Sequence, residues 1–263
     1  MERIRKYPRT PHLTGSKLQP GDEDLAAIPV ADLLNEHVVV EEKIDGANSG
    51  LSFDADGQLW LQSRGHYLTG GPRERHFNLF KQWAHTHAHL FWEVLGDRYL
   101  VYGEWMYAKH TVFYDALPHY FLEFDVYDRQ EGVFLSTERR RELLVSLPIV
   151  SVPVLWEGKV TRKVALESFM GPSLYKSVSW RASLESVCEG NNLDAALAAK
   201  QTDDSNQMEG LYLKVERDGQ VVERFKYVRA SFMQAIASSD GHWHDRPILP
   251  NQLAKGVDIF ATS

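Results

Sequence analysis

The sequence has a single cysteine, Cys188, among its 263 residues, and it has no hydrophobic run long enough to cross a membrane. One cysteine cannot form an internal disulfide or supply the paired thiolates of a typical structural zinc site. A spanning helix needs about 20 apolar residues, and no apolar segment of the secretory type follows the basic N-terminus. These absences exclude a disulfide scaffold and a helical membrane protein, and they predict a soluble, cytoplasmic protein.

An excess of positive charge and the glycine-rich phosphate loops are missing as well. Lys and Arg number 29 against 36 Asp and Glu, a formal net charge of −7. This balance argues against a protein that coats nucleic acid by bulk electrostatics, although clusters such as Arg139–Arg141 leave room for a local basic groove. Neither GxxxxGK[ST] nor GxGxxG occurs, so P-loop and Rossmann folds are disfavoured. The histidines at 85–89 and 242–244 are weak zinc candidates.

Short β-prone runs bounded by turn residues alternate with amphipathic stretches of helical period. Strands are expected at 38–42, 50–53, 59–63, 99–105, 120–127, 210–215 and 221–227, and helices at 74–94, 162–170, 184–200 and after 228. The turns at 54–57 and 217–219 join neighbouring strands into hairpins. Hairpins mixed with helices predict an α+β fold with antiparallel sheets and not a regular βαβ alternation.

The segment Lys43-Ile44-Asp45-Gly46 places a lysine at the end of a predicted strand and beside carboxylates. Such a lysine can form a surface ion pair of small energetic value, or it can be a nucleophile. An amine with an ordinary pKa of about 10.4 is protonated at neutral pH. A nucleophilic lysine therefore needs burial, a nearby cation or a metal to lower its pKa. Four residues recur by chance, so the interpretation depends on their companions.

Five further motifs follow this segment in order. They are Ser63-Arg64-Gly65, Tyr102-Gly103-Glu104-Trp105, Phe121–Asp128, Glu209–Lys214 and Arg224–Tyr227. On these six motifs the chain resembles the covalent nucleotidyltransferase superfamily of ATP-dependent RNA and DNA ligases and mRNA capping enzymes. The resemblance implies an α+β nucleotidyltransferase (ATP-grasp-like) domain, with antiparallel sheets flanked by helices and the nucleotide pocket between the sheets.

The resemblance also implies a role for each motif. Lys43 is the expected nucleophile, and Lys214 and Lys226 are the expected catalytic cations that neutralise charge on the α-phosphate. The implied metal ligands are Glu209 and Asp45, whose hard carboxylate oxygens suit Mg²⁺ or Mn²⁺. The expected nucleotide-binding residues are Glu42, Lys43, Asn48, Arg64, Glu104, Phe124, Glu209, Lys214, Arg224 and Lys226.

Several of these residues have a structural interpretation that does not depend on the family. Phe124 has the pattern of a sheet-core residue, although one aromatic ring can both fill a core and stack on adenine. Charged side chains at strand ends are commonly solvated. The last motif departs from the Lys-x-Lys usual in RNA ligases of this type. Arg224 keeps the positive charge there but changes the donor geometry.

Two features favour an RNA ligase within the superfamily. The segment 42–48 is similar to the EKxxGxN variant of RNA ligases of the second phage type, in which the asparagine, here Asn48, organises the site around the phosphates. Only 36 residues follow Tyr227, whereas DNA ligases and capping enzymes carry an OB-fold there. We therefore expect a single nucleotidyltransferase domain over 1–263, in which 229–263 form a short C-terminal extension without an OB-fold.

The expected reaction is ATP-dependent RNA ligation in RNA repair. Lys43 takes AMP from ATP, in preference to GTP, with Mg²⁺ or Mn²⁺ bound. The AMP passes to an RNA 5′-phosphate, which is then sealed to a 3′-hydroxyl, and a separate end-healing kinase/phosphatase is an expected partner. A minimal DNA-nick ligase and a nucleic-acid-binding module without sealing activity are the alternatives. Sugar preference at the nick separates the first, and transfer of label from α-labelled ATP separates the second.

Overall fold

The computed structural model describes residues 4–18, 22–162, 165–238 and 246–261. Within these residues the hydrogen-bonded strand order is β10-β3-β11-β12-β8-β7-β6-β4-β5. In addition, β1 pairs with β12, β2 pairs with β1, and β9 pairs with β7. The strands are β1 (His12–Leu13), β2 (Ala27–Ile28), β3 (His37–Lys43), β4 (Ala47–Phe53), β5 (Leu59–Ser63), β6 (Tyr99–Trp105), β7 (Phe121–Asp128), β8 (Val133–Leu135), β9 (Val150–Ser151), β10 (Val154–Lys159), β11 (Gly210–Arg217) and β12 (Gln220–Val228).

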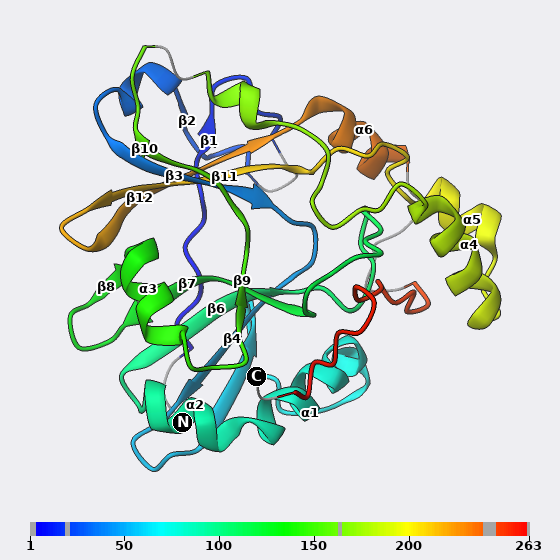
Figure 1. Ribbon diagram of the computed structural model, residues 1–263, viewed down its shortest axis with the longest axis horizontal. Helices are drawn as coiled ribbons and strands as arrows, with labels where there is room; N and C mark the ends of the chain where they lie inside the picture. The colour runs from blue at the N-terminus through cyan, green and yellow to red at the C-terminus, as the bar shows by residue number, and fades with distance from the viewer. Residues whose placement is uncertain (1–3, 19–21, 163–164, 239–245, 262–263) are drawn as a thin grey trace.

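The helices lie outside this sheet. They are η1 (Val30–Leu33), η2 (Pro72–Phe77), α1 (Asn78–Thr86), α2 (Ala88–Leu95), α3 (Thr137–Leu144), η3 (Leu166–Phe169), α4 (Trp180–Gly190), α5 (Ala195–Lys200) and α6 (Ala230–Ser238). Figure 1 shows the sheet in two layers, with β3, β11 and β12 in one and β4, β6 and β7 in the other. The β12–β8 pair joins the layers. The predicted α+β class with antiparallel pairing is confirmed, although β1–β12, β1–β2 and β7–β9 are parallel.

The expected hairpin turns form where short polar residues satisfy the backbone. The Asp54 side chain accepts from the backbone N–H groups of Asp56 and Gln58. Asp218 and Gly219 both have positive φ, 52° and 74°, which is the geometry of a two-residue hairpin turn. These local signals bring β11 and β12 together in the register that the last two motifs need.

Two predicted helices are interrupted. The helix expected at 74–94 breaks at His87, whose φ and ψ are −101° and 8°. Its imidazole is buried and packs against Trp83 and Phe91, so tertiary packing overrides the helical period. The helix expected at 184–200 ends at Gly190 and restarts after Asp194, whose side chain caps the N–H of Leu197.

The remaining differences are small in extent. The helix expected at 162–170 overlaps residues outside the described ones, and its described part contains only the 3-10 turn η3. The short strands β1, β2, β8, β9 and β10 were not expected. His242 and His244 lie outside the described residues. In the part of the chain that the structure describes, none of the helices combines the length and apolar character that a membrane span requires.

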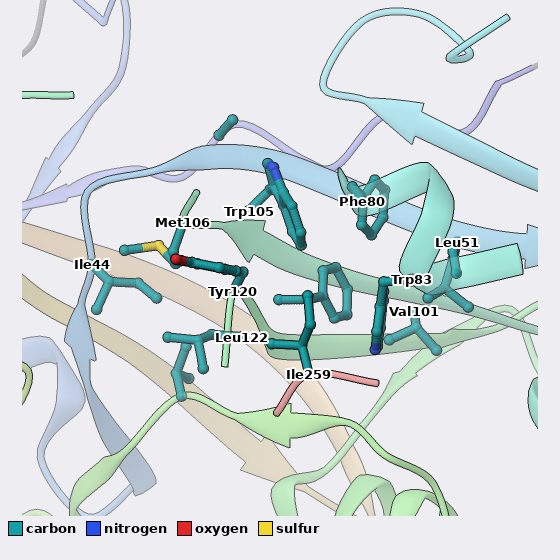
Figure 2. Packing of buried hydrophobic residues seen from close by; sticks show 14 of the residues in the cluster. Ile44, Leu51, Phe80, Trp83, Val101, Trp105, Met106, Tyr120, Leu122 and Ile259 are labelled. Carbon is teal, nitrogen blue, oxygen red and sulfur yellow. The ribbon is translucent and has the colours of Figure 1, made fainter. Parts of the chain in front are cut away.

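The main hydrophobic core supports the segment Lys43-Ile44-Asp45-Gly46, called the KIDG segment below. Figure 2 shows Ile44 beside Met106 and Tyr120, next to the stacked aromatic rings that fill the space between the sheet and α1. Ile44 is 5% exposed, so its burial anchors the residues on either side of it. A Cβ at Gly46 would lie 2.9 Å from the carbonyl oxygen of Trp105. Only glycine therefore lets the KIDG segment pass this close to β6.

Candidate active site

Two cavities meet at Lys43. The larger has a volume of about 910 Å³ and the smaller about 150 Å³. Residues that line both are Lys43, Ile44, Asn48, Arg64 and Glu104. The amine at the end of β3 is therefore accessible from two compartments.

The amine of Lys43 is held by Glu209. The register pairs Lys43 of β3 with Gly210 of β11, which places the preceding glutamate beside the lysine. The Nζ–Oε1 distance is 2.6 Å. Burial alone would lower the pKa of Lys43, but the charges of Glu209, Glu104 and Asp45 outweigh it and raise that pKa. In the absence of other cations the lysine is a protonated partner in an ion pair.

Three carboxyl groups surround the amine of Lys43. Burial raises the pKa of Glu104 to about 8 and that of Glu209 to about 7. Burial also raises the pKa of Asp45, against the backbone N–H groups of Thr111 and Val112, which donate to its carboxylate at 2.7 Å each. The site thus has an excess of acidic groups, and their raised pKa values show that the three do not all ionise readily beside Lys43 without further positive charge.

This excess suits a hard divalent cation. Carboxylate oxygens are the ligands that Mg²⁺ and Mn²⁺ prefer, and Glu209 and Asp45 both line the larger cavity. Among the described residues, no group of three His, Cys, Asp or Glu side chains could hold a metal by itself. A cation here would need further oxygens from a phosphate and from water, which is the usual situation for Mg²⁺.

Residues that the motif analysis missed hold Asp45 in place. Its backbone N–H donates to the Tyr114 hydroxyl at 2.9 Å. The Asn251 side chain accepts from the N–H of Tyr114 and donates to the carbonyl of Met106, so it spans the loop behind the site. No local pattern marks Tyr114 or Asn251, because each acts on a residue distant in the sequence.

Glu42 lines the smaller cavity, and its carboxylate accepts two hydrogen bonds from one neighbouring segment. The Ser173 hydroxyl donates to its Oε1 at 2.5 Å, and the N–H of Leu174 donates to its Oε2 at 3.1 Å. Burial raises the pKa of Glu42, and these two donors oppose the rise. Ser173 and Leu174 were likewise not expected from sequence.

The other walls of the smaller cavity come from β7, β12 and the N-terminal segment. Phe124 and Lys226 line it, as predicted for a nucleotide pocket, together with Tyr7 and Thr10. The Phe124 and Tyr7 rings meet edge to face, with centroids 5.0 Å apart. Lys226 is ion-paired with Asp22. Burial lowers the pKa of Lys226, and its bond to Asp22 opposes that effect.

The structure does not bring Lys214 and Arg224 to either cavity. Lys214 is fully buried, 2.9 Å from Glu41 and 3.4 Å from Asp125. The Arg224 Nε donates to Asp125 at 3.0 Å. The expected phosphate contacts of these two cations therefore remain predictions.

All the other predicted site residues line one or both cavities. They are Glu42, Lys43, Asp45, Asn48, Arg64, Glu104, Phe124, Glu209 and Lys226. Residues from six motifs, spread over most of the sequence, thus converge around one amine. A model of the RNA ligase family matches residues 36–228. The chain belongs to the RNA ligase family. The family predicted from the motifs is confirmed.

Solved structures of this family share the fold. An archaeal ATP-dependent RNA ligase has a TM-score of 0.51 at 17% identity, over 87% of this chain and 49% of the other. A Naegleria gruberi RNA ligase mutant with ATP and Mn has a TM-score of 0.52 at 15% identity, over 79% and 53%. Another N. gruberi mutant, with AMP and Mn, has a TM-score of 0.50 at 15% identity, over 88% and 57%.

The present chain thus spans about half the length of these structures. At such identities the likeness shows the nucleotidyltransferase fold alone. A comparison with curated proteins gave no significant match.

Proposed function

We propose that this RNA ligase family member joins RNA ends through a lysyl-AMP intermediate formed on Lys43 from ATP. The observation that carries the proposal is the position of the Lys43 amine, where the two cavities meet and 2.6 Å from Glu209. The smaller cavity, with Phe124, is suited to a purine base. The larger one leaves room for the phosphates and for an RNA end.

In the first step, the Lys43 nitrogen attacks the α-phosphorus of ATP. The ammonium form of Lys43 first loses a proton to solvent. A P–N bond then forms, the P–O bond to pyrophosphate breaks, and the nitrogen releases a second proton to solvent. Mg²⁺ or Mn²⁺ at Glu209 and Asp45 would supply positive charge that lowers the pKa of Lys43 and neutralises phosphate oxygens. In this proposal Glu104 holds the ribose, Asn48 and Arg64 hold the phosphates, and Lys226 binds the α-phosphate once it leaves Asp22.

In the second and third steps, the AMP passes to an RNA 5′-phosphate, and a 3′-hydroxyl displaces it to seal the strand. Both cavities contact Lys43, so an RNA 5′-end in the larger one can reach the adenylate without the base leaving the smaller one. The reaction requires 5′-phosphate and 3′-hydroxyl ends. We therefore place the protein in RNA repair, after an end-healing kinase/phosphatase, in a reducing compartment such as the cytoplasm.

The decisive experiment maps the covalent intermediate. The protein is incubated with α-labelled ATP and Mg²⁺ and denatured, and the labelled peptide is identified. Label is expected on Lys43 alone, and it is lost in Lys43→Ala. Lys159→Ala is the matched control, because this exposed lysine on the neighbouring strand β10 should leave labelling unchanged. Label on another lysine would contradict the assignment.

A panel of nicked duplexes then separates the alternatives. The sugars on each side of the nick are varied, and the 5′-phosphate and 3′-hydroxyl are kept. Sealing of RNA nicks is expected. Sealing of DNA nicks alone would indicate a minimal DNA ligase, and binding without any labelling of the protein would indicate a nucleic-acid-binding module.

A further inference from the structure

The N-terminal segment contributes a chain of hydroxyl groups to the smaller cavity. Figure 1 shows this segment, in blue, running from one layer of the sheet to the other. Along it, Tyr7 donates to Asp125 at 2.5 Å, the Tyr7 and Tyr212 oxygens are 2.8 Å apart, and the Tyr212 and Thr10 oxygens are 2.9 Å apart. Tyr7, Thr10 and Tyr212 all line the cavity.

The direction of every hydrogen bond in this chain follows from its buried end. Burial opposes ionisation of Asp125, but the charges of Arg224, Lys214 and Arg140 outweigh it and hold the pKa of Asp125 below its usual value. Asp125 is therefore a carboxylate, which can only accept. The single hydroxyl hydrogen of Tyr7 points to it, and the Nε–H of Arg224 donates to the Tyr7 oxygen at 3.0 Å.

The remaining two bonds are then determined in turn. Because the Tyr7 hydrogen is already committed, Tyr212 must donate to Tyr7. Because the Tyr212 hydrogen is committed in its turn, Thr10 must donate to Tyr212. A hydroxyl has one hydrogen and two lone pairs, so Thr10 is left with acceptor capacity only. Thr10 is 7% exposed and lines the smaller cavity, so this acceptor capacity is available at the cavity wall.

We propose that Thr10 is a specificity-determining residue whose hydroxyl oxygen accepts a hydrogen bond from the exocyclic amino group of adenine. The inference rests on the proposed function, in which the purine base occupies the smaller cavity. Adenine carries a donor at its 6-position, whereas guanine and hypoxanthine carry an acceptor there. A wall that can only accept therefore favours adenine and leaves a 6-oxo purine facing an oxygen lone pair.

The test measures base preference as a ratio within each variant. Dissociation constants are determined for AMP, for purine riboside 5′-monophosphate, which lacks the 6-amino group, and for IMP, which has a 6-oxo group. These monophosphates bind without reacting. For the wild type, AMP is expected to bind about 3- to 10-fold more tightly than the purine riboside nucleotide, which is the range for one hydrogen bond, and IMP still more weakly.

Three variants then test whether the preference for AMP depends on the Thr10 hydroxyl. Thr10→Val removes the acceptor and should bring the AMP to purine riboside ratio to within twofold of unity, whereas Thr10→Ser should keep it. Tyr7→Phe should lower the AMP to IMP ratio, because Tyr212 can then donate to Thr10 and the Thr10 hydrogen can turn into the cavity. Thr14→Val is the matched control, an exposed threonine of the same segment, and should leave both ratios unchanged.

The outcomes are distinct. An unchanged ratio in Thr10→Val, or an equal loss of affinity for all three nucleotides, would overturn the proposal, because a merely structural role weakens all three alike. Labelling by α-labelled ATP is followed separately. A wild type that prefers AMP through Thr10 but never forms lysyl-AMP would refute the proposed function and leave the role of Thr10 intact.

Discussion

Two groups of charges share one face of β3 and differ in their balance. Glu41 and Lys43 are two residues apart, so their side chains lie on the same face of the strand. Around Glu41, three acids meet three bases within the molecule, namely Glu41, Glu123 and Asp125 with Arg140, Lys214 and Arg224. Around Lys43, the acids Asp45, Glu104 and Glu209 act on one amine, and other lysines have only smaller effects on these acids.

The pKa values separate the two groups. The pKa of Asp125 is held below its usual value by its neighbouring cations, although burial opposes this. The pKa of Glu209 rises to about 7 because burial dominates there. In a balanced buried group, each charge has an opposite charge within the protein, and such a group suits the connection of strands. An unbalanced one needs a further cation, and this need distinguishes a site of chemistry from a structural network.

Breaking the balanced group should have the largest effect. Arg140 is fully buried and bonded to both Glu41 and Glu123. Arg140→Ala leaves two carboxylates buried without their cation, so unfolding is expected to become easier by about 3–5 kcal/mol. Urea denaturation followed by circular dichroism measures this. Arg141→Ala is the control, since the neighbouring side chain is half exposed, and an equal loss there would contradict the comparison.

Removing one charge from the unbalanced group should affect chemistry and not stability. Glu209→Gln is expected to slow lysyl-AMP formation by about 100-fold, the size of effect seen when one preorganised electrostatic group is lost. Stability should be kept, because a buried acid with a raised pKa is replaced by a neutral side chain. Single-turnover labelling and urea denaturation test the two parts, with the exposed Glu223→Gln as control. Unfolding of Glu209→Gln, with the rate per folded molecule preserved, would reverse the interpretation.

A comparison of Lys214 with Lys226 tests whether the group around Glu41 and the group around Lys43 differ in function. Lys226 lines the smaller cavity, whereas Lys214 lies among Glu41 and Asp125. We expect Lys226→Met to slow lysyl-AMP formation, per folded molecule, about tenfold more than Lys214→Met does, because a charge closer to the phosphate stabilises it more. Equal slowing would mean that Lys214 reaches the phosphate during the reaction, as its motif predicts.

Lys109, a buried cation outside both groups, should change stability least per pH unit, in a way that depends on pH. Lys109 donates to the carbonyl oxygens of His110 and Gln201, and burial lowers its pKa to about 7. The unfolded chain, with a pKa of about 10.4, binds more protons between pH 7 and 10. Stability should therefore rise with pH across that window, by at most about 1.4 kcal/mol per pH unit.

Lys109→Met isolates this contribution. The slope of unfolding free energy against pH, from urea titrations between pH 6.5 and 9.5, should be flatter in the variant than in the wild type. Parallel slopes would show that Lys109 stays charged in the folded protein. The comparison uses differences in slope, so any constant loss from the two carbonyl contacts does not affect it.

Prediction from sequence succeeded where local physics decides the outcome. The strands at 59–63 and 99–105 have the predicted bounds, because short β-prone apolar runs determine them locally. Motif order also indicated the residues around Lys43. Lys43 and Glu104 lie at or near the ends of β3 and β6, and Glu209 precedes β11, which runs antiparallel to β3. The break at His87 was missed because it depends on packing against Trp83 and Phe91.

The sequence by itself determined the chemical groups of this protein: a lysine followed by Asp-Gly, paired cations on β12, and strands whose period of two sets which side chains share a face. Only the tertiary structure decided which groups meet. Asp22 reaches Lys226 and Tyr7 reaches Asp125 across long separations in sequence. It is this packing that places Lys214 among buried acids and Lys226 at the cavity. The pairing of buried charges depends on the neighbours that folding brings within a few ångströms, and no local pattern contains that information.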